Sequence, residues 1–477
     1  MSDVTHISAP WDPRKAQQVL WAGMIGMLAT GFPFTIVTVA LNLIADDFGV
    51  SEAFAAWTVS APMLVSAATL PVIGKLGDLF GHRRIFIWGI LGSTVFAFMC
   101  MIAWDIWSLI AFRILSMVLA GATGPSAMAI LFHVFPPEHR NQAIGWWSMA
   151  GPGAAALGLI LGGPFIELFN WRSVFLVQAV AGFGAVILAW KVLPETEKQL
   201  VKFDHIGNLI LLLALSCLLF VIGAFAEPGV STVMLVSAGI VGVVGLIVFL
   251  FYEASIPNPI VPPSLLKQRN FDAPAVANFF MQMSYLGALI ATPLVFTGLF
   301  GFSIAVAAVL MLTRTFSLTL ASPLGGVIAT QFGERTGTIV GVLCQTAGLF
   351  TVAGGIYAVN LPVILLGLVL QGVGHGIAMP PLASVIATAV PSTQFGMASG
   401  MSRLMGQIGS AFGLSLFGVF LTLPRETLEL HMIFVIGAAI ALAAALPAAL
   451  ISMKHRAIPQ PPAAPPPPNP PIQPGQV

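Results

Sequence analysis

The sequence predicts an all-α integral membrane protein with about fourteen transmembrane helices. Of its 477 residues, 57% are hydrophobic and only 8% are charged, whereas about 45–50% apolar residues are usual in soluble domains. Long apolar runs alternate with short polar segments along most of the chain, and about 20 apolar residues suffice to cross a bilayer as a helix. The net charge of +1 lacks the basic footprint of a nucleic-acid-binding protein, so we expect no nucleic-acid partner.

Apolar windows of spanning length group as six, two and six. The first six fall at about 18–41, 54–73, 84–104, 106–133, 142–166 and 172–193. Two follow at about 206–225 and 231–251. The last six fall at about 273–299, 304–329, 336–358, 361–389, 398–423 and 430–452. The predicted organisation is thus an N-terminal tail (1–17), a six-helix half (18–193), a linker with two extra helices (194–272), a second six-helix half (273–453) and a disordered proline-rich tail (454–477).

The distribution of Lys and Arg predicts the orientation in the membrane. The first seventeen residues are polar and lack the apolar segment of a signal peptide, so we expect insertion through the first span. With the N-terminus inside, the outside loops hold only Arg172 and Arg425 among the Lys and Arg residues between spans. This bias places both termini in the cytoplasm, most simply at a bacterial inner membrane.

Residues suited to metal binding or catalysis do not cluster in the sequence. Cys100, Cys217 and Cys344 stand alone in apolar runs, without CxxC or Cys/His spacing. We therefore expect no metal, no disulfide framework and no cofactor. The absence of a Ser/His/Asp arrangement or a phosphate-binding glycine loop also argues against an enzyme.

A charged turn between the second and third spans stands out against the apolar background. Its residues Gly74, Asp78, Gly81, Arg83 and Arg84 follow the pattern Gly-x-x-x-Asp-x-x-Gly-x-Arg-Arg, which is similar to the signature loop of the major facilitator superfamily. The resemblance implies that the Asp meets the positive side of a neighbouring helix turn and latches one state of a carrier, and that the glycines let backbones approach closely. The alternative is an ordinary positive-inside loop.

A weaker copy of this turn follows the second span of the later set. The segment from Gly326 to Arg335 matches the place of the first turn, with Thr330 where the first has Asp78. We expect two pseudo-symmetric halves with a substrate site between them near the middle of the membrane. If both turns act as latches, the first half provides most of the latch.

Further stretches resemble the fourteen-helix drug:proton antiporter branch of that superfamily. They are Leu109–Arg113, Pro137–Arg140, the glycine-rich fifth span (Gly151, Pro152, Gly158, Gly162 and Gly163), Asn170–Leu176 and Pro259–Lys267. The resemblance implies secondary transport by alternating access, with protons as the coupling ion. It leaves open whether a periplasmic adaptor protein joins the carrier to an outer-membrane duct.

The sequence departs from the branch in three spans. Pro33 stands where these antiporters usually carry Asp in the first span, and Leu159 stands where the fifth span usually has proline. In the thirteenth span, Arg403 takes the place of an Asn and Gly406 that of an Arg, so the Arg has moved by about one helical turn on the same face. We interpret this shift as a retuned site, with drift as the alternative.

The predicted spans hold three arginines and no deep carboxylate. Ionisable residues inside a membrane are costly and usually functional, so Arg113, Arg314 and Arg403 need counter-charge from backbone carbonyls, water or an anionic substrate. For Arg113 the structural role is favoured; for the other two the alternatives stay open. His375 is the candidate proton carrier because histidine titrates near physiological pH, with Glu167 and Asp46 at the outer mouth as the next candidates.

Polar residues recur at helical spacing in three spans of the second half. The pairs are Asn278 with Gln282, Gln371 with His375, and Arg403 with Gln407. Each pair lies on one helix face, which favours a wet proton or substrate site, with interhelical hydrogen bonding as the alternative.

The most consistent function is proton-coupled export of a small organic compound, a drug or an organic anion. The intramembrane arginines and Pro33 favour an anionic or neutral substrate over a lipophilic cation. The alternatives are an uptake carrier for an organic anion and a substrate-sensing receptor built on a carrier fold. A channel is disfavoured because no ring of like charges recurs along the spans.

Overall fold

The computed structural model describes residues 12–31, 37, 40–55, 57–196, 204–224, 230–256, 259, 268–391, 394–421 and 427–452. Every regular element in these ranges is helical, and eleven helices are long and apolar enough to cross a membrane. The predicted all-helical membrane fold is therefore confirmed. The other three predicted spans fall on α1, on α9 with α10, and on α18, so the count of fourteen stays a prediction.

The N-terminal set of helices comprises α1 to α11. Its members are α1 (Pro13–Gly31), α3 (Leu41–Phe48), α4 (Glu52–Ala55), α5 (Trp57–Phe80), α6 (His82–Met101), α7 (Ile106–Ala120), α8 (Thr123–Val134), α9 (Pro137–Ser148), α10 (Ala150–Phe169) and α11 (Ser173–Val192). The predicted span 106–133 is divided into α7 and α8, and the region of 142–166 into α9 and α10. The short helices α3 and α4 were not predicted.

Two further helices follow, α12 (His205–Ala224) and α13 (Thr232–Ser255), which pack against each other. α12 also packs against α5. α13 continues beyond the predicted end at 251 and includes Glu253, whose side chain is 2% exposed. Glu253 is thus a buried carboxylate in the last turn of α13, at the end of a span and not deep within it, because the polar residues that end the apolar run still belong to the helix.

The C-terminal set comprises α14 to α20. Its members are α14 (Arg269–Leu294), the π-helical turn η2 (Val295–Leu299), α15 (Ile304–Phe332), α16 (Glu334–Tyr357), α17 (Leu361–Thr388), α18 (Phe395–Leu421), α19 (Thr427–Ala443) and α20 (Ala445–Leu450). A buried apolar cluster around Phe296, Leu349 and Phe434 fills this set. A second cluster, around Phe86, Phe132 and Trp147, fills the N-terminal set and continues into the C-terminal set at residues such as Ile386 and Met397.

Several helices begin at a side chain that caps free backbone N–H groups. The Asp105 carboxylate accepts the N–H of Ser108, whose hydroxyl in turn accepts the N–H of Asp105, forming a capping box before α7. Hydrogen bonds from the side chain and the backbone of Ser108 lower the pKa of the Asp105 carboxyl. The side chains of Ser303 and Asn360 cap α15 and α17 by accepting the backbone N–H of Val306 and of Val363.

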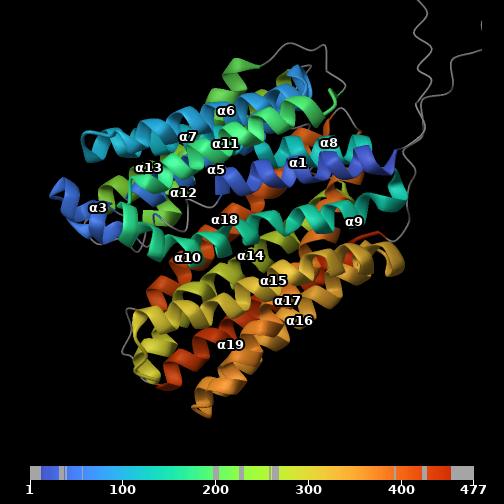
Figure 1. Cartoon of the computed structure of the whole chain (residues 1–477). Coiled ribbons are helices and arrows are strands. Elements are labelled where there is room, and N and C mark those ends of the chain that lie inside the picture. The colour runs from blue at the N-terminus through green and yellow to red at the C-terminus, as the bar shows by residue number, and fades with distance from the viewer. Residues whose placement is uncertain are drawn as a thin grey trace, which may run out of the picture.

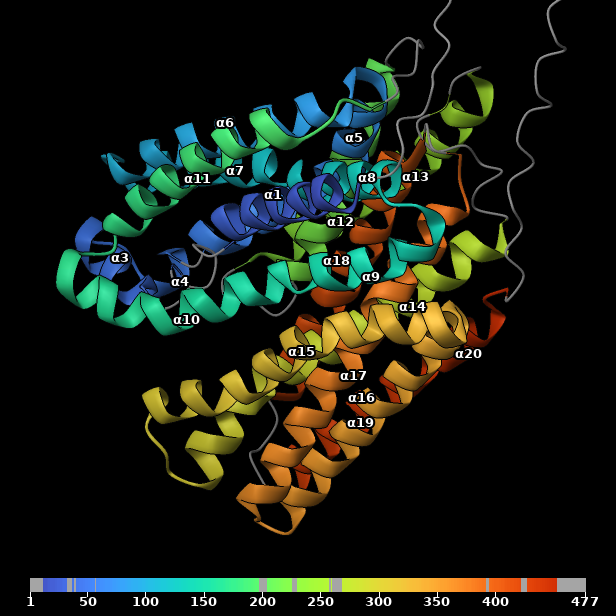
Figure 2. The ribbon, with the colours of Figure 1, turned by 45° about the vertical axis from the view of Figure 1, so that its right-hand side comes forward.

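The two sets pack along two long helix contacts. α5 of the N-terminal set lies against α18 of the C-terminal set, and α15 of the C-terminal set lies against α9 and α10. Figures 1 and 2 show that the sets approach each other at the end holding α9 and diverge toward the end holding α3. Residues at the contacts between sets are therefore the first place to seek function.

Candidate functional site

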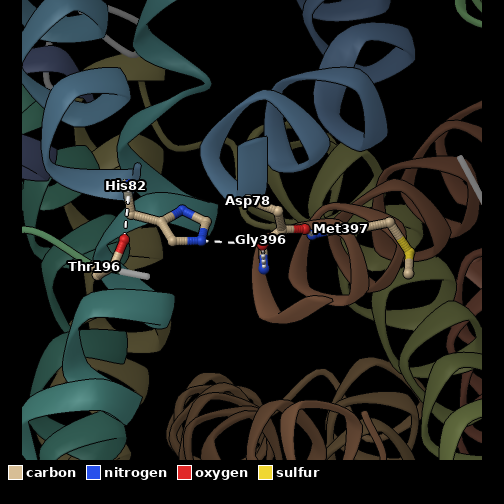
Figure 3. Close-up of polar contacts among 5 residues, drawn as sticks. All are labelled: Asp78, His82, Thr196, Gly396 and Met397. Atoms are coloured by element: carbon tan, nitrogen blue, oxygen red, sulfur yellow. Dashed lines mark hydrogen bonds and ion pairs between the residues drawn. The ribbon is translucent and has the colours of Figure 1, made fainter. Parts of the chain in front are cut away.

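The Asp78 carboxylate, near the end of α5, binds the N-terminus of α18. Its Oδ1 accepts the N–H of Gly396 and its Oδ2 the N–H of Met397, each at 2.9 Å (Figure 3). The side chain is 2% exposed. A negative charge on free N–H groups at a helix N-terminus is stabilised both by hydrogen bonding and by the helix dipole. Asp78 thereby joins the two sets.

Glycines let α5 and α18 cross at backbone distance around this carboxylate. A Cβ on Gly74 would overlap the carbonyl oxygen of Gly396, and a Cβ on Gly400 would overlap that of Leu70. We call this region, made of Leu70, Gly74 and Asp78 with Gly396, Met397 and Gly400, the Asp78 contact. Its close approach requires residues without side chains at Gly74 and Gly400.

His82 completes the surroundings of Asp78. Its Nε2 lies 3.0 Å from Asp78 Oδ1, and its backbone N–H donates to Thr196 Oγ1 at 2.9 Å (Figure 3). Gly81, just before it, has φ of 96°, a conformation that favours glycine. His82 thus belongs to the Asp78 contact in the folded protein, although the sequence analysis did not single it out.

Arg83 and Arg84 of the same turn point elsewhere. The Arg83 guanidinium donates to the carbonyl oxygen of Trp190 at 2.6 Å, and Arg84 forms an ion pair with Glu195 at 3.4 Å. Both partners lie at or beyond the end of α11. The structure therefore brings Gly74 and Asp78 to the other set, whereas the two arginines bind within their own.

A second contact between the sets repeats the first with the roles of the halves exchanged. A Cβ on Gly326 of α15 would overlap the carbonyl oxygen of Asn141 in α9, and Gly145 packs on the carbonyl oxygen of Ser322. The Asn141 side chain donates to Glu334 Oε1 at 3.2 Å. We call Ser322, Gly326 and Glu334 with Asn141 and Gly145 the Glu334 contact. Thr330 takes no part in it, because its hydroxyl donates to the Gly326 carbonyl of its own helix.

Two of the three intramembrane arginines bond to backbone carbonyls. Arg113, which is 6% exposed, donates to the Thr58 carbonyl and lies over the Phe175 ring. Arg314, 3% exposed, donates to the Tyr285 carbonyl at 3.1 Å and lies 4.2 Å from the centre of the Tyr285 ring. Arg403 differs: it reaches from α18 to the ring of Trp147 in α9, at 5.1 Å.

His375 belongs to a buried network within the C-terminal set. Its ring stacks on Tyr285, with centroids 4.1 Å apart, and its Nδ1 lies 3.0 Å from Gln345 Oε1. Gln345 Nε2 donates to the Met281 carbonyl and to Ser284 Oγ. Since the amide nitrogen is used there, the amide oxygen faces His375, whose Nδ1 carries the hydrogen. Sequence analysis missed Tyr285 and Gln345, because neither shares a helix with His375.

The other polar residues predicted with His375 make no hydrogen bond with it in the described part of the chain. Gln371 is fully buried in α17, and no hydrogen bond reaches its side chain within the described residues. Asn278 donates to the Ser402 carbonyl at 2.9 Å, and Gly406 packs against Asn278 and Gln282. Gln407 is half-buried in α18. Asn278 and His375 thus make interhelical hydrogen bonds, the alternative that the sequence left open.

An apolar cavity of about 250 Å³ lies where α1, α10 and α15 meet. Its lining includes Met24, Leu28, Ala156, Phe316 and Thr319. The cavity is bounded by both sets, and its lining is apolar except for Thr319 and backbone atoms.

The glycine-rich segment forms part of the same helix, α10. Gly151 packs on Met27 of α1, Pro152 is half-buried and Gly158 is buried. The surroundings of Gly162 and Gly163, the side chains of Leu159 and Glu167, and all of Pro33 lie outside the described residues.

Comparisons with known proteins agree with this architecture. The Major Facilitator Superfamily profile matches residues 23–252 and 274–475. The tetracenomycin C resistance and export protein of Streptomyces glaucescens is 26% identical over 88% of this chain and 78% of its own. A multidrug resistance protein B homolog of Mycobacterium tuberculosis is 29% identical over 81% and 73%.

Solved structures share the fold. A crystal structure of a human organic anion transporter has a TM-score of 0.67 at 16% identity, covering 92% of this chain and 100% of that one. The structure of a proton:xylose symporter has a TM-score of 0.66 at 14% identity, covering 91% of this chain and 95% of that one. The chain belongs to the Major Facilitator Superfamily, and its similarity to named export proteins supports the drug-efflux branch of that family.

Proposed function

We propose that this transporter exports small organic compounds by alternating access, coupled to protons. The observation that carries the proposal is the Asp78 contact, in which a buried carboxylate on one set binds free N–H groups on the other. Such hydrogen bonds break when the sets separate and form again when they close. The contact therefore suits a latch on one of two carrier states.

The latched end is the cytoplasmic one in this proposal. The turn from Gly74 to Arg84 lies on the side where Lys and Arg accumulate. The Asp78 and Glu334 contacts both join the sets there, and the sets diverge toward the opposite end (Figure 2). The structure thus corresponds to a carrier that is closed to the cytoplasm and faces outward.

The cavity at α1, α10 and α15 favours substrates with an apolar body. It touches both sets, so movement of one set against the other changes its shape. Export of tetracenomycin C and of multiple drugs is named for relatives of this chain. We extend this substrate class to the present protein.

His375 is the residue we assign to proton coupling. With its Nδ1 hydrogen directed at Gln345, its Nε2 holds the lone pair that a proton would take. Because Gln345 also bonds α14, through Met281 and Ser284, a change in protonation would be felt by three helices of the C-terminal set.

Transport in vesicles tests this function. A carrier exchanges labelled for unlabelled substrate without a gradient and accumulates it when a proton gradient is imposed. We expect His375→Gln to retain exchange and lose gradient-driven accumulation. The control is His431→Gln in α19, where the histidine ring contacts the Tyr357 ring; this variant should retain both activities. Binding without exchange in the unmodified protein would contradict the carrier and indicate a sensor, and gradient-driven accumulation by His375→Gln would remove His375 from coupling.

A further inference from the structure

Arg403 is the one intramembrane arginine of the described chain that no hydrogen bond holds. Arg113 and Arg314 each donate to a backbone carbonyl and are almost completely buried. Arg403 makes no hydrogen bond or ion pair with the described residues, and its side chain is half-buried. The difference separates two arginines with structural partners from one whose donors stay available.

The guanidinium of Arg403 lies between the two sets. It extends from α18 of the C-terminal set to the ring of Trp147 in α9, with 5.1 Å between Cζ and the ring centre. On its other side it packs against Gly124 of α8, where a Cβ would overlap the guanidinium. Gly124 thus leaves the space that the arginine occupies, and the cation lies at the interface between the two sets.

The described residues around this cation provide hydrogen-bond donors and no anion. A guanidinium carries five N–H donors arranged to bind a carboxylate with two parallel hydrogen bonds. The indole Nε1–H of Trp147, a residue 4% exposed, also lacks an acceptor within the described part of the chain. An arginine inside a membrane protein without a paired carboxylate is costly, so a ligand that provides the negative charge is the natural complement.

An apolar compartment adjoins the same tryptophan. Met149 and Ala150, two and three residues after Trp147, line the cavity at α1, α10 and α15. Met24 of α1 lines it too, and the neighbouring Gly23 packs on the Trp147 ring. The cationic group and the apolar cavity therefore flank one aromatic side chain.

We propose that Arg403 and Trp147 bind the acidic head group of the transported substrate, so that the exported compounds are amphipathic organic anions. The acidic group lies on the guanidinium and the apolar body extends toward the cavity. The inference rests on the proposed export function and specifies its substrate class. Gly124 provides the space that the Arg403 guanidinium occupies, whereas a Cβ at Gly406 would lie 3.0 Å from the Asn278 amide nitrogen.

Binding of 1-naphthoate to the purified full chain tests the proposal. The protein is placed in nanodiscs of phosphatidylcholine, and affinity is measured by thermal shift and by quenching of tryptophan fluorescence. 1-Naphthamide and 1-naphthylmethylammonium share the ring system and serve as neutral and cationic probes. We expect naphthoate alone to bind well, and Arg403→Gln to weaken it by about ten- to hundredfold, as for loss of hydrogen bonds to a charged group.

Two further variants separate recognition from folding. Gly124→Ala keeps the charge but displaces the guanidinium, so naphthoate affinity should fall while the charge of the protein stays the same. Arg269→Gln removes an exposed arginine at the start of α14 and should leave affinity unchanged. Equal naphthoate affinity in Arg403→Gln and the parent, or equal binding of the three probes, would overturn the assignment.

A lipid head group offers the same chemistry as an organic carboxylate. Repeating the titration in phosphatidylglycerol nanodiscs distinguishes them: a lipid-binding Arg403 would make naphthoate binding weaker there in the parent protein, and this result would overturn the substrate assignment. Export measured in parallel keeps the two proposals apart. Export of neutral compounds with no anion preference overturns only the Arg403 inference, whereas naphthoate binding without any exchange overturns only the export function.

Discussion

The Asp78 and Glu334 contacts share a backbone geometry and differ in electrostatics. In both, a glycine of the second span in one set meets the carbonyl of the facing helix, Gly74 at Gly396 and Gly326 at Asn141. A second glycine lies four residues further along each facing helix, Gly400 and Gly145. Only the first contact adds a buried carboxylate that binds backbone N–H groups.

The position at which each facing helix begins explains the difference. α18 begins at Phe395, so Gly396 and Met397 are in its first turn and their N–H groups have no partner inside the helix. α9 begins at Pro137, so Asn141 is already in the second turn and its N–H is used within the helix. A carboxylate at Thr330 would find no free donor. The second set instead uses Glu334, the first residue of the next helix, α16, to bind the Asn141 side chain.

The largest effect should come from filling the glycine crossings. Valine at Gly74 or at Gly326 would overlap a backbone carbonyl, and overpacking typically costs about 1–3 kcal/mol. We expect both variants to depopulate the closed state to a similar degree, because the steric part of the two contacts is alike. Distances between spin labels at Phe80 and Phe332, exposed residues at the ends of α5 and α15, measure the opening in a cysteine-free background.

If the distance between the two spin labels in Gly74→Val equals that in the parent protein, the glycine crossing is not needed for the closed state. Alanine at Gly184, where a Cβ meets no atom within 4 Å, is a matched control in a glycine-bearing helix.

Charge removal should affect the two contacts unequally. Asp78→Asn keeps one acceptor oxygen for the N–H groups of Gly396 and Met397 and loses the other, so we expect a total loss of about 1.5 kcal/mol, the value of one hydrogen bond to a charged group. Glu334→Gln retains an acceptor for Asn141, so we expect less than about 1 kcal/mol. The same spin-label pair reports both. A larger opening in Glu334→Gln than in Asp78→Asn would show that the assignment of the main latch is wrong.

The smallest effect is predicted for the change that makes the second turn look like the first. Thr330→Asp places a carboxylate at the position equivalent to Asp78, but the N–H groups of α9 at this crossing are already bonded within the helix. We expect no gain in closed-state population and a small loss of thermal stability. A more populated closed state in Thr330→Asp would show that helix start positions do not decide which half carries the latch.

Sequence reasoning placed some of these residues correctly and missed others for a physical reason. Asp78 and Gly74 lie in one short turn, so their spacing was visible, and Asp78 does meet a helix N-terminus. The roles of Tyr285, Gln345 and Gly124 were invisible, because each acts on a side chain from another helix. Glu253 was overlooked because the apolar run ends before its helix does.

The sequence by itself determined that helices span the membrane and roughly which residues form each helix. Long apolar runs must satisfy their own backbone hydrogen bonds in lipid, and an α-helix does so using only neighbouring residues. Only the tertiary structure decided which arginine keeps its donors available and which backbone N–H groups the Asp78 carboxylate binds. Those outcomes depend on the register between helices far apart in sequence: Arg403 beside Gly124, and the first turn of α18 beside Asp78. No local pattern encodes that register, because it is set by the packing of two surfaces at once.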